Sequence, residues 1–266
     1  MAYIALIPDT FSGTRVITYE YPFSERIRTF LRLEDLLQRS IHFRSSDEPM
    51  HHHIAILALF ETIEVAGRAD LKIDLVQELE RQRQILLSFR DNPDISEDAL
   101  RDALKEIEQT SSSLLAMTGR FGQHLRENEW LTSIRNRASI PGGACEFDLP
   151  SYHYWLNRDA QSRHRDLDAW VKPMKPIEEA LAIVLRLLRS SGRVEPQVAR
   201  AGTFQMPMGG STAQMVRIRI ARTEAAVPEI SANKYALNIR FMLPETQLRP
   251  RPLERDLPFE LTFCGL

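Results

Sequence analysis

The stretch QMVRIRIA, residues 214–221, marks the point at which the chain changes from helical to strand periodicity. Apolar and basic side chains alternate in it, so the valine and isoleucines face one way and the arginines the other. KYALNIRFML, residues 234–243, alternates in the same way, and PFELTF, residues 258–263, does so weakly. Turn-forming residues separate these stretches, with turns expected at Gly209 and Gly210 and at Val227 and Pro228. Together they predict an antiparallel β domain over residues 192–266.

Upstream of residue 192, apolar side chains recur at the spacing of amphipathic helices. Ser24 is placed to cap the first of these helices. Two long helices flank the turn DNPDIS, residues 91–96, and their core positions repeat at alternating steps of four and three residues. That spacing predicts an antiparallel helical hairpin that resembles a short coiled coil. One further helix is expected over residues 123–139, and two or three more between residues 150 and 191.

A helical region followed by a run of strands predicts an α+β fold with segregated layers. We expect an N-terminal extension over residues 1–16, a mainly helical domain over residues 17–191 and the antiparallel β domain over residues 192–266. A first strand near residues 16–21 is placed to join the β domain.

The composition is that of a folded protein without a strong electrostatic bias. The 266 residues carry 34 basic and 36 acidic side chains, a formal net charge of −2. An anionic partner must therefore be met by a local basic patch. The first residues lack the basic start and long apolar core of a signal peptide, and charges interrupt the most apolar helix. We therefore expect a cytoplasmic protein that makes no contact with a membrane.

The motifs of common catalytic and cofactor sites are missing from the sequence. No glycine-rich phosphate loop follows a strand, and no G-x-S-x-G, H-E-x-x-H or C-x-x-C occurs. Cys145, Asp148 and His153 fall within nine residues, but cysteine hydrolases gather such groups from distant segments. A small buried thiol is therefore favoured for Cys145. Adjacent histidines on a helix point about 100° apart, so the triplet at residues 51–53 indicates a partly exposed helix start. We expect no enzyme activity, no cofactor and no metal.

The predicted strands also offer a basic surface. If their apolar sets face one core, a single outer face carries four basic side chains: Arg217, Arg219, Lys234 and Arg240. A solvated face and a site for an anionic partner both stay open on this pattern. Among such partners an acidic peptide is favoured over nucleic acid. The reason is that Tyr235 and Phe241 are expected to point inward, which leaves no outward ring to stack on bases.

The stretch SIPGGACEFDLPSYHYWL, residues 139–156, concentrates glycine and proline between two predicted helices. We interpret it as a rigid joint. Its glycines end one helix, and Phe147 and Leu149 anchor the crossing in the core. A proline then begins the next helix, which presents Tyr152 and His153.

Several stretches together resemble the ZapD family of bacterial cell-division proteins. They are, in order, YPFSERIRTFLRLEDLLQ, ELERQRQ, RFGQHLRE, RNRASIPGGACEFDLPSYHYWL and NIRFM. The resemblance covers residues 17–263, and residues 140–156 are its most specific part. It implies a non-enzymatic cytoplasmic homodimer with a helical and a β domain, which binds the C-terminal tail of the tubulin-like protein FtsZ. Such a dimer cross-links and bundles FtsZ filaments and stabilises the division ring at mid-cell.

The resemblance also implies which side chains receive the FtsZ tail. The matching positions are Arg32, Arg68, Arg126, His153 and Arg240, with Lys234 as a companion. Glu129 and Ala236 depart from the pattern, because they stand where relatives can be basic. Either the contacts differ in this chain, or a second set of arginines compensates: Arg135, Arg137, Arg217 and Arg219.

Three other interpretations stay open on the residues alone. A nucleic-acid-binding module would use the arginine-bearing sheet face and show a steep dependence on salt. A thiol hydrolase would use Cys145 and His153. An adaptor protein would work through the coiled-coil-like hairpin between Leu75 and Leu114.

Overall fold

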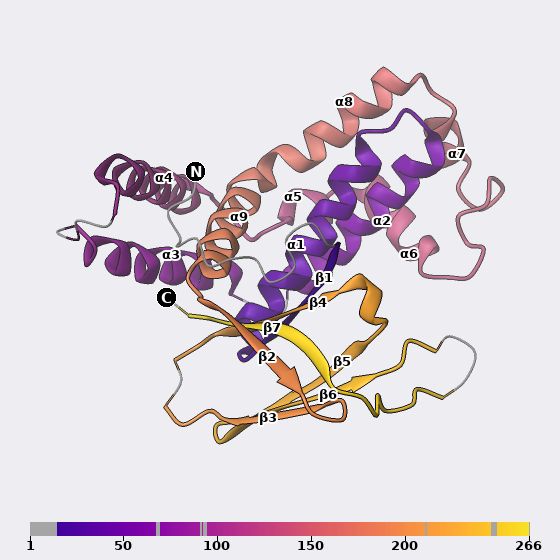
Figure 1. Ribbon diagram of the computed structural model, residues 1–266. Helices are drawn as coiled ribbons and strands as arrows, with labels where there is room; N and C mark the ends of the chain where they lie inside the picture. Colours follow the sequence, from indigo (N-terminus) through magenta and orange to yellow (C-terminus); the bar gives the residue numbers. More distant parts are fainter. Residues whose placement is uncertain are drawn as a thin grey trace. The chain divides into compact units, whose positions relative to one another are not determined.

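The computed structural model describes residues 15–67, 70–90, 92, 95–210, 212–245 and 249–265 (Figure 1). These residues fall into two compact units. The first is formed by the described residues of Met1–Arg28 and Arg186–Leu266, the second by those of Thr29–Leu185. The first unit holds the strands, and the second holds most of the helices. The predicted α+β class, with a mainly helical part ahead of an antiparallel β part, is confirmed.

The strands of the first unit form two antiparallel sheets. The larger has the order β1 (Val16–Pro22), β4 (Met215–Ala221), β7 (Leu257–Cys264), β2 (Val194–Ala199). The smaller has the order β3 (Thr203–Pro207), β6 (Ala236–Met242), β5 (Val227–Ala232). Both sheets turn apolar residues to one core, in which the rings of Phe241 and Phe259 lie 5.1 Å apart. The unit is therefore a two-layer sandwich.

All four edge strands of this sandwich contain a proline, whereas the central strands β4 and β6 contain none and the central strand β7 has Pro258 near its start. Strands β1, β2, β3 and β5 lie at sheet edges, and each contains one proline: Pro22, Pro196, Pro207 and Pro228. Proline has no N–H to donate to a strand ladder, so edges tolerate it best. The alternation in sequence predicts β4, β6, β7 and the first strand, but it misses β2, β3 and β5. The turn expected at Val227 and Pro228 is wrong, because both residues belong to β5.

The division between the units falls within α1 (Glu25–Arg44) and α9 (Lys175–Ser190). The elements between them are α2 (Pro49–Ala66), α3 (Leu71–Leu87), α4 (Glu97–Ala116), α5 (Gln123–Arg126), α6 (Glu129–Ala138), α7 (Pro150–Leu156), α8 (Ala160–Val171) and the 3-10 turn η1 (Lys172–Met174). A second 3-10 turn, η2 (Arg222–Glu224), follows β4. Within the described residues, no helix is both long and apolar enough to span a membrane.

Helices α3 and α4 form the predicted hairpin. Leu75 and Leu79 of α3 are buried, as are Ile107 and Leu114 of α4, and the two helices pack against each other. Ser96 caps α4 by accepting a hydrogen bond from the Ala99 backbone. Residues 91, 93 and 94 of the predicted turn lie outside the described residues.

The single helix expected over residues 123–139 is instead two helices. Helix α5 ends at Arg126, and the Asn128 side chain caps α6 by accepting a hydrogen bond of 3.0 Å from the Leu131 backbone. Asparagine is a strong N-cap residue, so the break has a local cause. The break turns Arg126 and Arg135 toward the same hollow, which is described below.

The histidine triplet at the start of α2 is more buried than expected. His52 is fully buried, and its Nδ1 accepts a hydrogen bond of 3.0 Å from Arg163 Nε. His51 Nδ1 lies 2.8 Å from the hydroxyl of Ser46, and His53 Nδ1 lies 2.7 Å from that of Tyr152. Burial lowers the pKa of His52 and His53 and raises that of the Tyr152 phenol. Each histidine meets a different partner, as their angular separation requires.

Two details of the joint at residues 139–156 correct the sequence-based interpretation. Phe147 is 80% exposed and anchors nothing, whereas Leu149 is buried as expected. Tyr152 is buried against Trp155 and Trp130 rather than presented to solvent. Cys145 is also exposed, contrary to the buried thiol favoured above.

Candidate partner-binding surfaces

The four basic side chains expected on one sheet face lie on two different sheets. Arg217 and Arg219 belong to β4 of the four-stranded sheet, whereas Arg240 belongs to β6 of the three-stranded sheet. The apolar faces of both strands meet in one core, so their opposite faces point away from each other. Lys234 lies in the turn between β5 and β6. The expected common face is therefore wrong, because alternation gives the face of a strand but not its sheet.

Arg217 and Arg219 are held by carboxylates of their own sheet. Arg217 Nε lies 3.0 Å from Glu20 of β1, the residue directly across the ladder. Arg189 donates two hydrogen bonds of 2.8 Å to the same carboxylate. Arg219 Nη1 lies 2.9 Å from Glu260, which is also its direct neighbour across the ladder and is fully buried. These arginines therefore balance internal charges.

Arg240 has a different environment. It is exposed, and its direct neighbours across the ladder are Thr203 and Glu229. No carboxylate of the described residues lies within ion-pair distance of it. Gln205 and Ser231, which share its face, are polar and exposed. This sheet face presents a guanidinium to solvent on a regular backbone.

The turn between β5 and β6 presents a cation and a ring together. The Asn233 side chain accepts hydrogen bonds of 2.8 and 3.0 Å from the backbones of Tyr235 and Ala236 and fixes the turn. Lys234 Nζ lies 4.7 Å from the centroid of the Tyr235 ring, and that ring is 70% exposed. The expectation that Tyr235 points inward is wrong, because β6 begins only at Ala236.

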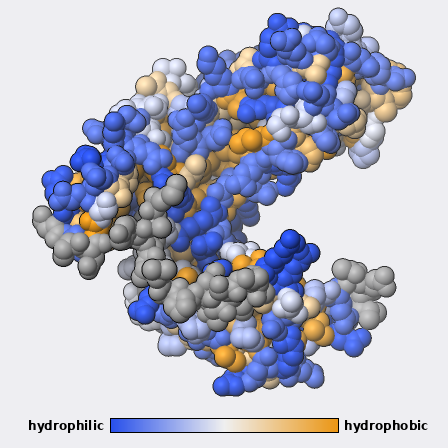
Figure 2. All heavy atoms as spheres, turned by 45° about the horizontal axis from the view of Figure 1, so that its top comes forward, coloured by the Kyte–Doolittle hydropathy of each residue, from blue (hydrophilic) through white to orange (hydrophobic). Residues whose placement is uncertain are grey.

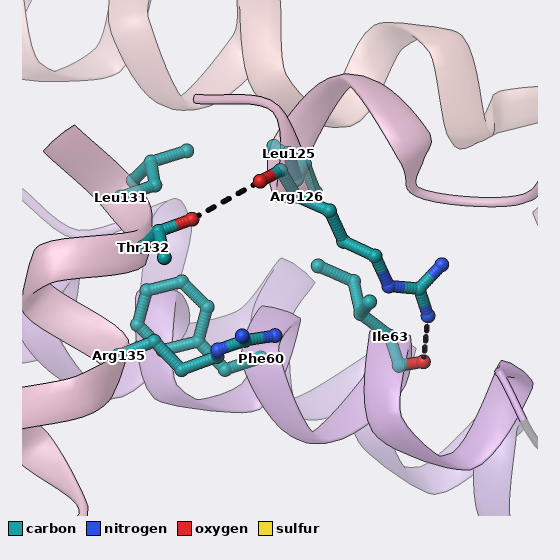
Figure 3. A pocket seen from close by; sticks show the side chains of 7 residues that line it. All are labelled: Phe60, Ile63, Leu125, Arg126, Leu131, Thr132 and Arg135. Atoms are coloured by element: carbon teal, nitrogen blue, oxygen red, sulfur yellow. Dashed lines mark hydrogen bonds between the residues drawn. The ribbon is translucent and has the colours of Figure 1, made fainter. Parts of the chain in front are cut away.

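In the helical unit, Arg126 and Arg135 line one small hollow (Figure 3). Arg126 reaches it from α5 and Arg135 from α6. Arg126 Nη2 donates to the backbone carbonyl of Ile63 at 2.7 Å, and Nη1 donates to that of Phe121 at 3.1 Å. Arg126 therefore helps to satisfy the C-terminal end of α2. Nothing in the sequence pattern indicates that α5 packs against the end of α2.

The other basic candidates of the helical unit lie apart in the chain. Arg32 is exposed on α1, and Arg137 Nη1 lies 3.7 Å from Asp148. His153 is exposed on α7, with Nε2 3.4 Å from the Asn157 amide. In the set of Cys145, Asp148 and His153, the carboxylate and the imidazole therefore each lie next to a residue outside the set. Arg68 lies outside the described residues.

The two departures from the family pattern have local explanations. Glu129 is the first residue of α6, where a carboxylate is stabilised by the positive end of the helix dipole. Ala236 begins β6 and faces Pro207 of the edge strand β3. Neither position has a local structural need for a basic residue.

Exposed apolar side chains accompany the basic candidates. Figure 2 shows hydrophilic residues over most of one face of the molecule, with hydrophobic residues reaching the surface between them. Tyr154, next to His153, is 71% exposed, and Ile140 is 50% exposed. The candidate surfaces therefore combine charge with apolar area.

Comparison with known proteins gives a consistent answer. A family model for ZapD, described as a cell division protein, matches residues 31–240. A cell division protein ZapD of Azoarcus sp. (strain BH72) is 68% identical over 251 residues, which cover 94% of this chain and 100% of that protein. The ZapD of Dechloromonas aromatica (strain RCB) is 60% identical over 252 residues, with 94% and 100% covered. This chain therefore belongs to the ZapD family of cell division proteins.

Proposed function

We propose that this protein is a non-enzymatic cell-division factor that binds the C-terminal tail of FtsZ. As a homodimer in the cytoplasm, it cross-links and bundles FtsZ filaments at mid-cell. Membership in the ZapD family supports a role in division. The observation that carries the tail-binding step is the exposed Arg240, which has no carboxylate of the described residues within ion-pair distance on its sheet face.

The proposed contacts are fewer than the full set of basic candidates. They are Arg240 and Lys234 in the sandwich and, as a separate set, Arg32, Arg126, Arg135 and His153 in the helical unit, together with Arg68. The proposal leaves out Arg217 and Arg219, whose guanidiniums balance Glu20 and Glu260, and Arg137, which faces Asp148. A bound peptide would have to break those pairs.

The energetics of such a site require more than charge. An exposed ion pair contributes about 0.2–1 kcal/mol, whereas a micromolar site needs about 8 kcal/mol. Apolar contacts must therefore supply a share of the affinity. A two-fold dimer carries each surface twice, and filaments display many tails, so weak single contacts add up to firm bridging.

Fluorescence anisotropy with a labelled FtsZ tail from the same organism tests the proposal. Arg240→Glu is compared with Arg222→Glu, which reverses an exposed arginine of η2 outside the proposed site. We expect saturable binding that weakens with salt, is reduced in Arg240→Glu and is unchanged in Arg222→Glu. Absence of binding to the wild type at low salt would overturn the proposal.

A second candidate function rests on the Lys234 and Tyr235 pair. An exposed ring beside an ammonium group is the arrangement on which single-stranded nucleic acids stack. This candidate predicts binding of a labelled oligonucleotide with a steep salt dependence, lost in Tyr235→Ala. Binding of the FtsZ tail without binding of the oligonucleotide eliminates it.

A further inference from the structure

A buried guanidinium ties together two turns of the helical unit. Arg163 of α8 is only 4% exposed, and its hydrogen bonds to the described residues all go to uncharged groups. It donates to the carbonyls of Leu156 and Arg158 at the end of α7 and in the turn that follows, residues 157–159. It also donates to the carbonyl of Asp47, in the turn between α1 and α2, and to His52 of α2. One cation therefore joins the α7–α8 turn to the α1–α2 turn.

The contact between His52 and Arg163 fixes the tautomer of the histidine. A guanidinium only donates hydrogen bonds, so His52 Nδ1, 3.0 Å from Arg163 Nε, must accept with its lone pair. The ring proton is then on Nε2, which donates to the backbone carbonyl of Ser46 in the α1–α2 turn. Because His52 is fully buried, both of its ring nitrogens are satisfied only in the neutral form.

A second proton on His52 would break this arrangement. It would turn Nδ1 into a donor against the N–H of Arg163 and place two cations in one buried site. The other ionisable groups that face His52 do not relieve this conflict. His164 of α8 has its ring centroid 4.7 Å away, and the Asp47 carboxylate lies 2.9 Å from His164 Nε2. A protonated His164 would therefore take that carboxylate for itself. Trp155 of α7, which packs on the ring, carries no charge.

We propose that the contact between His52 and Arg163 is an acid-sensitive latch. It holds the α7–α8 turn to the α1–α2 turn while His52 is neutral, and it opens when His52 takes up a proton. This inference is independent of the proposed function. Opening frees the C-terminal end of α7, the helix on which His153 and Tyr154 are exposed. A candidate partner surface thus becomes more mobile in acid.

The direction of the pH dependence follows from the burial of His52. Burial lowers the pKa of this histidine in the closed latch, whereas in the open latch the ring reaches water and titrates near pH 6.5 or so, the usual value of about 6.5. The closed state is therefore fully favoured above about pH 7. Below about pH 6.5 the open population should rise up to about tenfold per pH unit, until the lowered pKa of the closed state is reached.

Hydrogen exchange with water, followed by NMR between about pH 5 and 8, tests the latch. Two N–H groups report on it: Arg163 Nε–H, which donates to His52, and the Arg158 backbone amide, which donates to the Trp155 carbonyl at 3.2 Å. Their protection, relative to an unstructured peptide at the same pH, should fall up to about tenfold per pH unit below about pH 6.5. Nitrogen-15 shifts should show His52 Nδ1 without a proton at the upper pH and protonated where protection is lost.

Two glutamine variants separate the latch from its surroundings. His52→Gln offers Arg163 an oxygen and Ser46 an N–H without titrating, so protection should not change with pH. His53→Gln is the matched control on the next residue. Its histidine contacts Tyr152 instead, so the pH dependence of the latch should remain.

Three results would overturn the latch. The first is a proton on His52 Nδ1 at the upper pH, which the wild type alone reveals even if His52→Gln does not fold. The second is loss of the pH dependence in His164→Gln, which would assign the proton to His164. The third is equal protection of the latch groups and of the core amides in the α3–α4 hairpin at every pH, because only global unfolding would then expose them.

Discussion

The two outer faces of the sandwich carry arginines for opposite purposes. On the four-stranded sheet, Arg217 and Arg219 lie directly across the ladder from Glu20 and Glu260. On the three-stranded sheet, Arg240 stands in solvent without an ion pair among the described residues. The alternation that places these arginines in sequence is the same. Each of these arginines has a glutamate directly across the ladder, so the difference is that only Arg217 and Arg219 lie within ion-pair distance of theirs.

The largest expected effect concerns the outer face of the four-stranded sheet, which carries Arg217 and Arg219. Glu260→Gln keeps the shape of the side chain but leaves the Arg219 guanidinium without its counter-charge. Breaking a buried pair in this way costs about 3 kcal/mol. Urea unfolding should therefore show a lower midpoint with an unchanged slope. The matched change on the other sheet, Glu229→Gln, should stay within about 0.5 kcal/mol of the wild type. Equal losses in the two variants would erase the contrast between the faces.

The next effect concerns the outer face of the three-stranded sheet, which carries Arg240. Arg240→Glu should weaken binding of the FtsZ tail five- to tenfold, about 1.0–1.4 kcal/mol, and leave the unfolding midpoint unchanged. Arg219→Glu should instead lower the midpoint, because it places a carboxylate against buried Glu260. Anisotropy and urea unfolding on both variants give the answer. Reduced stability of Arg240→Glu would instead mean that Arg240 stabilises the fold.

The pH dependence of the free energy of unfolding separates the effect of the buried histidines in the helical unit from that of these ion pairs. Burial lowers the folded pKa of His52 and His53, so the unfolded chain binds more protons in the acidic range. The free energy of unfolding should be constant above about pH 7 and fall below the unfolded pKa of about 6.5, by up to about 1.4 kcal/mol per pH unit for each histidine. His53→Gln keeps an acceptor for the Tyr152 hydroxyl and should make this decline shallower. Urea unfolding between pH 5 and 8 measures it; parallel profiles would contradict this origin.

The smallest effect concerns the only carboxylate directly across the ladder from Arg240. Cross-strand charge pairs contribute about 0.2–1 kcal/mol, so Glu229→Gln should raise tail affinity by about twofold. The same anisotropy titration detects it. Ser231→Ala, on the same strand face, serves as control and should have no effect. A loss of affinity in Glu229→Gln would mean that Arg240 needs this carboxylate to hold its geometry.

The sequence predicts what depends on local periodicity and misses what depends on neighbours. The α3–α4 hairpin and strands β4 and β6 follow from spacing alone. Strands β2, β3 and β5 are missed because their prolines are allowed by an edge position that only the sheet defines. The split between α5 and α6 depends on one capping residue, Asn128.

The same limit applies to the candidate sites. Sequence identifies Arg126 and Arg135 as basic, but their shared hollow depends on how α2 packs against α5 and α6. The partners of Arg217 and Arg219 lie on strands distant in the chain, so spacing along β4 does not reveal them.

The prolines of the four edge strands affect how copies of this protein can associate through their sheet edges. A second copy that added its own strand to β1, β2, β3 or β5 would meet at least one position unable to donate a hydrogen bond. The sandwich therefore resists growth into a continuous sheet, even where many copies gather at high local density. Assemblies of this protein would then be held together by side chains and stay reversible, because no shared backbone ladder locks them.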